Sequence, residues 1–356
     1  MKIFIEGSHF STPYQGTYTY LSGILHGITI YKPEIKIILG LYNDSQLPPE
    51  ILNNPSIELY IYRRTGKLNL FLFEIPAILK NKKISKAIFQ YIIPPISFNK
   101  CSYYPVIHDI LFMDYPEYFS KYYRLIRIIF FYFSAKRSKK IITVSEYSKK
   151  RISQNFKIKS KNIFVVPNAV PETFIQHDLN KIKSKEYIFK KYNIKNFVLY
   201  VSRFEPRKNH SLILKSKVLN QYDHIVFIGH NTFDQNLEDL KTKAIWLEGI
   251  ENSTLLEFYN ACELFIYPSF AEGFGIPPLE AGAMKVPVVC SNATAMEDFS
   301  FFNKTFFNPN DLESFEKAIE IAKKQSENEL EEIRKVILNK YNWVTNAEIL
   351  VNNLNL

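Results

Sequence analysis

The sequence predicts an α/β protein built from two Rossmann-like domains with parallel sheets. Short apolar runs typical of buried strands alternate with polar stretches of helical spacing, most clearly between residues 197 and 290. The length of 356 residues exceeds one typical core and suits two domains of about 170 residues each. Glycines and charged residues follow several of the apolar runs directly, at the strand ends where a parallel sheet binds ligands.

The first half begins with a short strand, Lys2-Ile-Phe-Ile5, a loop around Gly16 and a helix expected over residues 17–25. A later strand ends in Val106-Ile-His-Asp109, so His108 lies at a strand end, where a polar side chain can meet a ligand. A core or capping histidine is the alternative, as a plain turn is for Gly16. Asp109 is expected to cap the local turn, because Asp bonds nearby backbone N–H groups.

We predict that the chain divides into three parts. Residues 1–171 form the first domain, residues 172–338 form the second, and a terminal helix over 339–356 returns to the first domain. Residues 172–196 are polar and lysine-rich, as expected of a linker. The second domain then alternates regularly. Strands are predicted at 197–201, 224–229, 244–247, 264–267 and 286–290. A polar helical stretch is predicted before residue 244, and further helices are predicted at 252–262, 311–324 and 327–339.

The most informative stretch follows the strand Leu264-Phe-Ile-Tyr267. Gly273 and Gly275 let the backbone turn tightly, and Pro277-Pro278 presets a first helical turn, in which Glu280 is expected. Glu272 lies on the loop before it. Unpaired N–H groups at a helix start attract phosphate or sugar oxygens, so the pattern predicts a site for an anionic, hydroxyl-rich ligand. The alternative is an ordinary strand–loop–helix unit with a capping Glu.

A basic loop follows the strand at Phe197. Arg203 and Lys208 are suited to hold a diphosphate, because a guanidinium takes two oxygens and an ammonium acts as a point charge. A solvated basic turn is the alternative, and it is strongest for Arg207, which we expect could simply face solvent.

These segments resemble the retaining glycosyltransferases of family 4, whose E-G-F-G-x-P-x-L-E-A run carries a Glu-x7-Glu pair. The basic loop is similar to the family's G-R-x-E-P-R-K-N, with Ser202 where glycine is usual, and residues 106–120 are similar to its His-Asp strand end and Pro-Glu-x-Phe turn. The G-D-A usual after the acid at Glu297 is absent. The resemblance is strong from Val198 to Val289, moderate from Val106 to Val170 and thin elsewhere.

The resemblance implies a GT-B fold, two Rossmann-like domains facing across a cleft. It also implies retaining transfer of a hexose or deoxyhexose from a nucleotide diphosphate sugar to a glycan or lipid-linked glycan, as in bacterial capsule, lipopolysaccharide or O-antigen synthesis. The implied catalytic residues are Glu272, His108, Arg203 and Lys208. The implied donor-binding residues are Gly16, Arg203, Lys208, Gly249, Ile250, Glu272, Gly273, Phe274, Gly275, Ile276 and Glu280.

Within that set, Arg203 and Lys208 would hold the diphosphate and Glu280 the ribose, while the backbone at Gly249 and Ile250 would hold the base. Glu272 and His108 would bind the sugar. In the implied mechanism the acceptor hydroxyl attacks on the face that the phosphate leaves, and the protein positions and neutralises charge. Double displacement with Glu272 as nucleophile remains open. No Asp-x-Asp motif stands at the expected site, so we expect no metal and no cofactor.

Charge is uneven along the chain. Residues 121–151 hold ten basic residues and one acid, Glu146, within a net charge of +10. Interleaved with Tyr122, Tyr123, Phe130, Phe131 and Phe133, they could seat an anionic membrane surface. The alternative is a helix with its aromatics in the core and its basic face solvated. Nucleic-acid binding is not expected, because no recognised module is present.

Composition predicts a cytoplasmic protein, with a peripheral position on the membrane as the added expectation. Cys101, Cys262 and Cys290 are widely separated and show no metal spacing, as in a reducing compartment. We see no signal peptide, and the apolar run 128–133 is far shorter than the roughly 20 residues that span a bilayer.

Three other classes of protein are alternatives to a transferase. A sugar phosphorylase would need a pyridoxal phosphate lysine in a different setting. A nucleotide hydrolase or kinase is disfavoured because no G-x-x-x-x-G-K-[ST] loop occurs. A catalytically inactive sugar- or nucleotide-binding scaffold of the same fold is the remaining alternative, and the presence of Arg203, Lys208, Glu272 and Glu280 together disfavours it.

Overall fold

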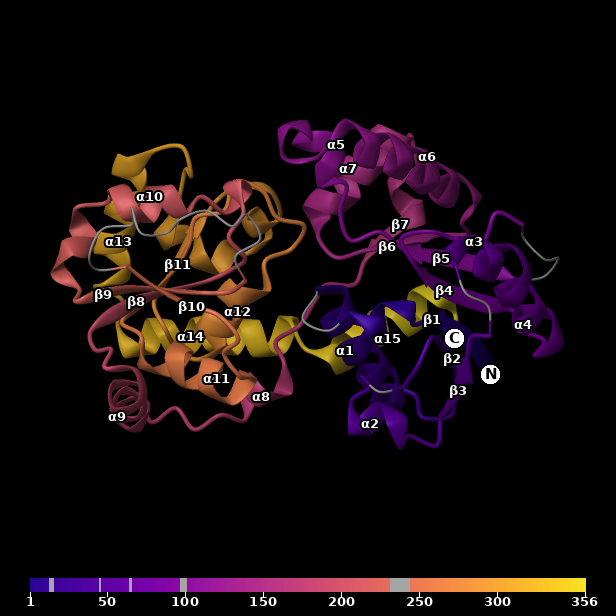
Figure 1. Ribbon diagram of the computed structural model, residues 1–356, viewed down its shortest axis with the longest axis horizontal. Helices are drawn as coiled ribbons and strands as arrows, with labels where there is room; N and C mark the ends of the chain where they lie inside the picture. Colours follow the sequence, from indigo (N-terminus) through magenta and orange to yellow (C-terminus); the bar gives the residue numbers. More distant parts are fainter. Residues whose placement is uncertain (13–15, 45, 64–65, 97–100, 231–243) are drawn as a thin grey trace. The chain divides into compact units, whose positions relative to one another are not determined.

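The computed structural model describes residues 1–12, 16–44, 46–63, 66–96, 101–230 and 244–356. The chain forms two compact units. Unit 1 comprises Met1–Ala169 together with Tyr341–Leu356, and unit 2 comprises Val170–Lys340. Each unit is built on one parallel sheet with helices on both of its faces (Figure 1). The polar helical stretch predicted before residue 244 lies outside the described residues.

The sheet of unit 1 has the order β3-β2-β1-β4-β5-β6-β7. Its strands are β1 (Lys2–Glu6), β2 (Lys36–Leu41), β3 (Ile57–Ile61), β4 (Lys86–Gln90), β5 (Ser102–Val106), β6 (Ile141–Thr143) and β7 (Ile163–Val165). Every pair is parallel, and β1 lies between β2 and β4. Consecutive strands run outward in opposite directions from the β1–β4 pair, which is the doubly wound arrangement.

The helices of unit 1 connect these parallel strands. They are η1 (Ser8–Ser11), α1 (Gly16–Tyr31), α2 (Pro49–Leu52), α3 (Lys67–Asn69), η2 (Leu70–Glu74), α4 (Ile75–Asn81), α5 (Leu111–Asp114), η3 (Pro116–Tyr118), α6 (Lys121–Arg137), α7 (Glu146–Phe156), η4 (Ser160–Asn162) and α15 (Trp343–Leu354). Polar caps mark several starts: the hydroxyls of Ser120 and Ser145 accept backbone N–H groups of α6 and α7.

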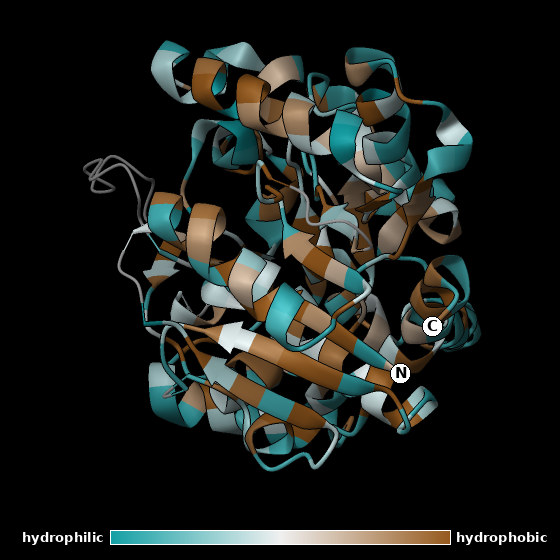
Figure 2. Ribbon diagram, turned by 90° about the vertical axis from the view of Figure 1, so that its right-hand side faces the viewer, coloured by the Kyte–Doolittle hydropathy of each residue, from teal (hydrophilic) through white to brown (hydrophobic). Residues whose placement is uncertain are grey.

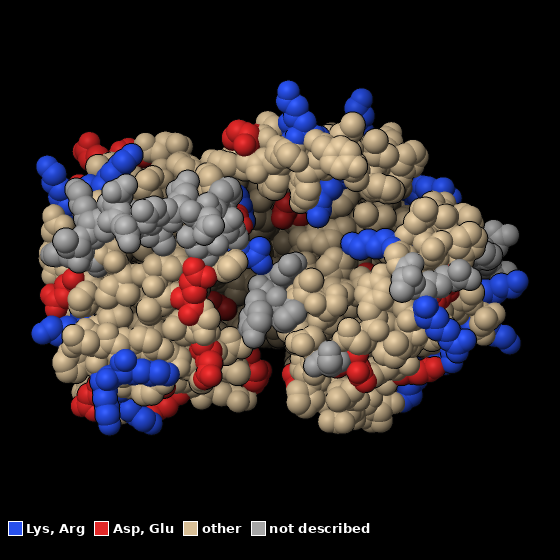
Figure 3. Space-filling view, in the orientation of Figure 1, with Lys and Arg blue, Asp and Glu red and all other residues tan. Residues whose placement is uncertain are grey.

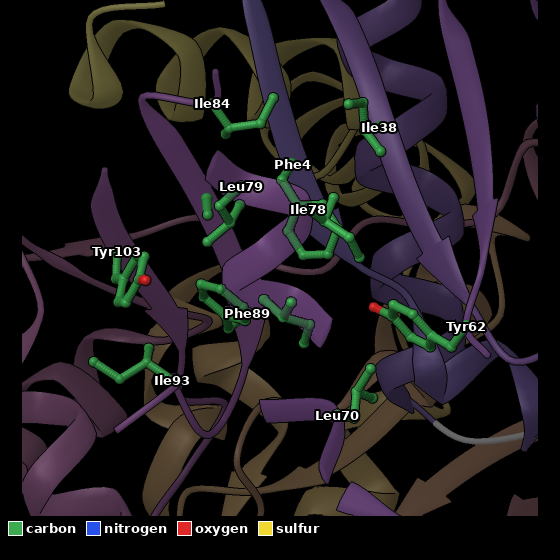
Figure 4. Packing of buried hydrophobic residues seen from close by; sticks show 12 residues of the cluster. Phe4, Ile38, Tyr62, Leu70, Ile78, Leu79, Ile84, Phe89, Ile93 and Tyr103 are labelled. Carbon is green, nitrogen blue, oxygen red and sulfur yellow. The ribbon is translucent and has the colours of Figure 1, made fainter. Parts of the chain in front are cut away.

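Apolar residues of alternate strand positions fill both faces of this sheet. Phe4, Phe89 and Tyr103 pack against Leu79 and neighbouring residues of η2 and α4 (Figure 4). A second cluster joins β5, β6 and β7 to α6 and α7. Figure 2 shows the strands as mostly hydrophobic ribbons, whereas the helices carry hydrophobic and hydrophilic residues in turn. The apolar runs of the sequence thus correspond to two-sided burial, as parallel sheets require.

The last helix, α15, completes unit 1 by packing against α1. Gly23 and Gly27 on α1 face Trp343, and a Cβ at Gly23 would overlap its indole ring. Tyr20 meets the same ring edge-on at 6.0 Å. Lys32 and Lys140 donate to the carbonyl oxygens of Leu356 and Asn353, where cations stabilise a helix end.

The sheet of unit 2 has the order β10-β9-β8-β11-β12-β13. Its strands are β8 (Phe197–Val201), β9 (His224–Ile228), β10 (Ala244–Leu247), β11 (Leu264–Tyr267), β12 (Val288–Ser291) and β13 (Phe306–Phe307), all parallel. The switch of winding direction falls between β8 and β11, the two strands that precede the predicted site loops.

The helices of unit 2 cover both faces of its sheet. They are α8 (Glu172–Ile175), α9 (Lys181–Tyr192), η5 (Pro206–Lys208), α10 (His210–Lys215), η6 (Val218–Gln221), α11 (Asn252–Ala261), α12 (Ile276–Ala283), η8 (Thr294–Asp298), η9 (Ser300–Thr305), α13 (Leu312–Ala322) and α14 (Glu327–Lys340). In Figure 1, α10 and α13 lie on one side of the sheet and α9, α11 and α14 on the other.

Two predictions about local structure were wrong. Residues 172–196 are not a linker: they form α8 and α9. Helix α9 packs on α11, its Ser184 donates to Glu257 of α11, and its Ile188 is fully buried. The strand predicted from Val286 begins only at Val288, because Pro287 has no N–H for a ladder and Val286 donates back to Ala281 instead. The helix expected over 17–25 extends from Gly16 to Tyr31.

Candidate functional site

The predicted donor residues of unit 2 gather at one edge of its sheet. β8, β10 and β11 are parallel and end at Val201, Leu247 and Tyr267, so the loops that follow all leave from the same edge. The loops after β8 and β11 flank the switch in winding direction, where an open α/β sheet has its ligand crevice.

Glu272 is the centre of a buried charged cluster. Lys208 Nζ donates to Glu272 Oε1 at 2.6 Å, and Arg207 Nη1 donates to Oε2 at 3.0 Å. Arg207 Nε lies 2.8 Å from Glu205 Oε2. One carboxylate therefore binds both basic side chains of the preceding loop, one through each oxygen. The alternative in which Arg207 simply faces solvent is wrong, because its guanidinium links Glu205 and Glu272.

Hydrogen bonds to backbone carbonyl oxygens tie the loop after β8 to β8 itself and to the loop after β11. Phe270 N–H donates to the carbonyl oxygen of Arg207 at 2.8 Å, and the Tyr200 hydroxyl donates to that of Lys208 at 2.8 Å. Arg207 also donates to the carbonyl oxygen of Ala271 at 2.9 Å. These bonds fix the positions of the cations before any ligand arrives, and such preorganisation is what a charge-stabilising site requires.

Electrostatics keep the Glu272 carboxylate ionised. Burial alone would raise the pKa of Glu272, but the charges of Lys208 and Arg207 outweigh it and lower that pKa to about 2. Burial lowers the pKa of Lys208, with Glu272 opposing. Burial and the charge of Lys208 lower the pKa of His210 to about 3, so this imidazole is neutral at pH 7.

The loop–helix junction differs from its prediction by one detail. α12 begins at Ile276, and Gly275 before it has φ of +101°, a conformation that favours glycine. Glu280 is consequently the fifth residue of α12 rather than a member of its first turn. Its Oε2 accepts from the Tyr259 hydroxyl at 2.7 Å, and burial raises the pKa of Glu280 to about 7 despite that bond.

Thr294 is a site residue that the sequence did not indicate. Its hydroxyl accepts the backbone N–H of Glu272 at 2.9 Å, and its φ is +56°, which is unusual for a β-branched residue. Strained residues of this kind persist where the surroundings hold them, often at functional sites. The signal was hidden because the sequence shows only the start of a short helix at this position.

Arg203, Gly249 and Ile250 lie on the loops after β8 and β10. Arg203 and Gly249 are exposed, and Gly249 has a positive φ of +65°. Beside the first loop, Phe204, His210 and Trp246 pack together, with ring centroids 4.8 to 5.4 Å apart. Gly273 and Phe274 complete the loop before Gly275, and Phe274 is buried against Phe299.

The candidates in unit 1 are His108 and Gly16. His108 is buried just beyond β5, and its Nε2 lies 3.1 Å from Gln90 Oε1. Burial, with the charge of His9, lowers the pKa of His108 to about 3. Gly16 is exposed at the start of α1 with open space where a Cβ would stand. The prediction for Asp109 is confirmed, since its Oδ1 accepts the N–H of Leu111.

α6 presents an apolar and basic surface. Tyr122, Leu125, Ile129 and Phe133 follow one helical stripe and are 76, 59, 46 and 58% exposed. Only Phe131 among the aromatics singled out in 121–151 is buried in the core. The alternative that placed these aromatics in the core was therefore wrong for the others. Figure 3 shows Lys and Arg side chains projecting over this region at the top of the view.

Two further properties concern metals and membranes. Within the described ranges, no three His, Cys, Asp or Glu side chains gather in a way that could hold a metal ion. None of the helices in the described part of the chain combines the length and the apolar character needed to cross a membrane.

Comparison with known families identifies the class. Residues 183–340 match the family model of the glycosyl transferases group 1, and residues 38–174 match that of glycosyltransferase family 4. The two matches do not overlap and follow the two units closely. The chain belongs to the family 4 glycosyltransferases, and its two parallel-sheet units are those of the GT-B fold.

Curated relatives include enzymes of O-antigen synthesis. The chain is 32% identical over 224 residues to the O-antigen chain mannosyltransferase RfbU of Salmonella typhimurium, covering 60% of this chain and 58% of that protein. It is 28% identical over 221 residues to O-antigen chain mannosyltransferase B of Escherichia coli, covering 58% and 57%. The chain thus spans little more than half the length of these relatives.

Solved structures share the fold across the whole chain. A sucrose-phosphate synthase from Thermosynechococcus elongatus is similar with a TM-score of 0.75 at 14% identity, covering 100% of this chain and 98% of that one. Anabaena HepE in complex with UDP and glucose is similar with a TM-score of 0.70 at 16% identity, covering 100% and 99%.

Proposed function

We propose that this protein is a retaining hexosyltransferase that moves a sugar, mannose in the first instance, from a nucleotide diphosphate donor to a glycan or lipid-linked glycan. The observation that carries the proposal is the buried cluster of Glu272, Lys208 and Arg207 at the switch point of unit 2. Mannose is the first choice because RfbU and its Escherichia coli counterpart are named as mannosyltransferases.

The cluster suits the leaving group of such a reaction. Lys208 has three N–H donors, and its bond to Glu272 leaves two for phosphate oxygens. Arg203, exposed at the end of β8, adds a guanidinium that can take two oxygens of a diphosphate. Both charges offset the negative charge that develops as the bond from the anomeric carbon to the phosphate oxygen breaks.

In the proposed reaction the acceptor hydroxyl oxygen bonds to the anomeric carbon on the face from which the nucleotide diphosphate departs. The hydroxyl proton passes to a phosphate oxygen of the leaving group, so the products are a glycoside and a nucleoside diphosphate. Glu272, already ionised and bound to both cations, orients the sugar together with the backbone of 273–276. We place Glu280 at the ribose, Gly249 and Ile250 at the base, Gly16 at the diphosphate and His108 at the transferred sugar, with no metal or other cofactor.

Nucleotide-dependent thermal unfolding in EDTA tests the donor site. UDP, GDP, dTDP, ADP and CMP are compared, because a ligand at a hundred times its dissociation constant adds about 2.7 kcal/mol of stability. We expect one nucleotide to raise Tm and Arg203→Ala to abolish that rise. The absence of a rise with every nucleotide, or a rise only with added Mg²⁺, would contradict the metal-independent donor site.

Product analysis tests the reaction itself. With the selected donor and a panel of glycan acceptors, NMR of the product should show the anomeric configuration of the donor retained. Glu272→Gln should remove turnover while nucleotide binding persists, as a role at the sugar requires. Unaffected turnover in Glu272→Gln would contradict the role of Glu272 at the sugar, and no turnover of the native protein with any donor and acceptor would favour a catalytically inactive binding protein.

We also propose that the protein works in the cytoplasm and contacts the anionic face of the membrane through residues 121–151. The Tyr122, Leu125, Ile129 and Phe133 stripe supplies apolar area, and Lys121, Lys136 and Arg137 stand exposed at the two ends of the helix. Each basic side chain near an anionic surface adds about 1 kcal/mol. The cysteines form no disulfide among the described residues, which fits a reducing compartment.

Vesicle co-sedimentation tests this contact. Binding to vesicles containing 30% phosphatidylglycerol should exceed binding to pure phosphatidylcholine and weaken at high salt. Leu125→Asp with Phe133→Asp should remove it, whereas Val336→Asp, at an exposed apolar position of α14, should not. Equal sedimentation of both variants would refute the contact.

A further inference from the structure

Thr294, the first residue of η8, has an unusual backbone conformation. Its φ is +56°, and it is the one β-branched residue with a positive φ in the part of the chain that the structure describes. In this left-handed region a branched Cβ crowds the backbone, so glycine or asparagine is the ordinary occupant. The conformation costs free energy, and a cost of this kind is kept mostly where a site needs the geometry.

This conformation holds Thr294 against the loop that carries Glu272. Thr294 Oγ1 accepts the backbone N–H of Glu272 at 2.9 Å. The carboxylate of the same glutamate binds Lys208 through one oxygen and Arg207 through the other. The Thr294 hydroxyl therefore contacts the residue on which the buried charged cluster is centred.

The hydroxyl of Thr294 uses only part of its hydrogen-bonding capacity. A threonine hydroxyl has one O–H donor and two acceptor lone pairs. Thr305, also buried in unit 2, donates its hydroxyl proton to the carbonyl oxygen of Phe302. Thr294 is 5% exposed, and among the described residues its hydroxyl accepts the Glu272 N–H and donates to no protein group. Because an unpaired buried donor is costly, this O–H indicates a ligand that supplies the acceptor.

Neighbouring groups indicate the chemistry of that ligand. Lys208 binds Glu272 with one of its three N–H donors, which leaves two for a ligand. Both Lys208 and Thr294 are held on Glu272, one at its carboxylate and the other at its backbone N–H. The unused groups are donors in both cases, so the ligand that fits them presents acceptor oxygens. Phosphate and sugar oxygens are both acceptors of this kind.

We propose that Thr294 is a further donor-binding residue: its hydroxyl accepts the Glu272 N–H and donates its own proton to an oxygen of a bound nucleotide diphosphate sugar. The strained backbone keeps that hydroxyl beside Glu272. For the identity of the ligand the assignment rests on the proposed function. Thr294 makes and breaks no covalent bond; it holds the donor and the loop that carries Glu272.

Titration calorimetry of the full chain tests the role of the hydroxyl. The probes are GDP, UDP, dTDP and ADP, and the mannose or glucose conjugate of each. Thr294→Val, which keeps the shape but loses the hydroxyl, should weaken the binding of the preferred probe about tenfold. Thr294→Ser, which keeps the hydroxyl, should bind within about twofold of the native chain. Thr305→Val is the matched control and should leave the affinity unchanged.

The two kinds of probe locate the oxygen that Thr294 binds. A loss shared by the nucleoside diphosphate and its sugar conjugate assigns the hydroxyl to a phosphate oxygen, and a loss confined to the conjugate assigns it to the sugar. Native affinity of Thr294→Val for both probes would overturn the proposal. Equal losses in Thr294→Ser and Thr294→Val would also overturn it, because the methyl group rather than the hydroxyl would then matter.

Stability separates a binding role from a structural one. Thr294→Gly removes the hydroxyl and relieves the backbone, so without ligand its Tm should equal or exceed that of the native chain, while its affinity falls as in Thr294→Val. A lowered Tm in Thr294→Gly would assign Thr294 to the scaffold and overturn the proposal. Native affinity in Thr294→Val beside lost binding in Arg203→Ala would overturn the role of Thr294 alone. A native chain that binds none of these nucleotides would overturn it together with the donor site.

Discussion

At the scale of the residue, replacing Arg203 and replacing Arg207 should have different effects on stability. Arg207 joins Glu205 and Glu272 within the protein, so Arg207→Gln leaves Glu272 with one cation and should destabilise unit 2 by about 2 kcal/mol. Arg203 is exposed, and Arg203→Gln should change the free energy of unfolding by less than about 0.5 kcal/mol. Urea unfolding of both variants measures the difference. Equal losses of stability would show that the buried ion pairs do not distinguish the two arginines.

The carboxyl group of Glu280 should make nucleotide affinity depend on pH. In the donor site proposed above, ribose hydroxyls donate to the ionised carboxylate of Glu280, and burial raises the pKa of that carboxyl to about 7. Below pH 7 the group is protonated in the free protein and must lose that proton on binding. Nucleotide affinity should therefore fall as pH falls, by at most about tenfold per unit below the pKa. Titration calorimetry between pH 5.5 and 8 measures this dependence.

Two controls isolate that carboxyl group. Glu280→Gln cannot titrate, so its affinity should be flatter with pH. A 2′,3′-dideoxynucleotide with the same phosphates should show only the titration of those phosphates. The same pH profile for the natural and the dideoxy nucleotide would mean that Glu280 does not bind the ribose.

The site residues that could be predicted from the sequence are those on loops that follow a predicted strand. Glu272, Gly275 and Lys208 follow strands directly, so the alternation of apolar runs was enough to bring them to one edge. Thr294 and the inward turn of Arg207 were not predictable in this way, because each depends on a partner 22 and 65 residues away. Spacing along the chain carries no information about such pairings.

At the scale of the element, the contact of α1 with α15 depends on the absence of a side chain at Gly23. A methyl group there would overlap Trp343, so Gly23→Ala should cost about 1–3 kcal/mol. For a unit of this size that lowers Tm by about 2–4 °C per kcal/mol. Gly16→Ala, in the same helix with open space around it, is the matched control and should not lower Tm. A Gly23→Ala protein as stable as the control would contradict the close packing.

Helix boundaries show what the sequence could predict about elements. The helix predicted over 311–324 and the terminal helix predicted over 339–356 agree with α13 and α15 to within a few residues. The side chains of Asp311 and Asn342 cap the starts of these two helices. The segment 172–196 was misjudged as a linker because its lysines dominate the composition. The burial of Ser184 and Ile188, together with the hydrogen bond from Ser184 to Glu257 of α11, shows that α9 is part of a packed layer.

At the scale of the whole molecule, unit 1 is made from two stretches of chain that lie on either side of unit 2 in the sequence. Residues 341–356 contribute Trp343, Leu350 and Val351 to the interior of unit 1. Removing them should expose the face of α1 that carries Tyr20, Gly23 and Gly27 and meets Trp343, and each large apolar side chain that loses its burial costs about 1.5–3 kcal/mol.

Truncation after Lys340 tests this interdependence. Calorimetry should show the unfolding transition of unit 1 lowered or lost, while the transition of unit 2 and its shift with nucleotide remain. Replacing the same segment's exposed Val344 by Ser should have little effect. An unchanged transition for unit 1 after truncation would show that the terminal helix contributes nothing to its stability.

The arrangement also orders events during synthesis. A ribosome that has produced residues 1–340 has delivered every residue of unit 2 but not the helix that covers α1, so the unit made first is the one finished last. Until α15 emerges, the face of α1 that α15 covers stays open to chaperones or to proteolysis. Only a chain translated through α15 has both units closed, which gives the cell a physical distinction between copies that contain α15 and copies that stop before it.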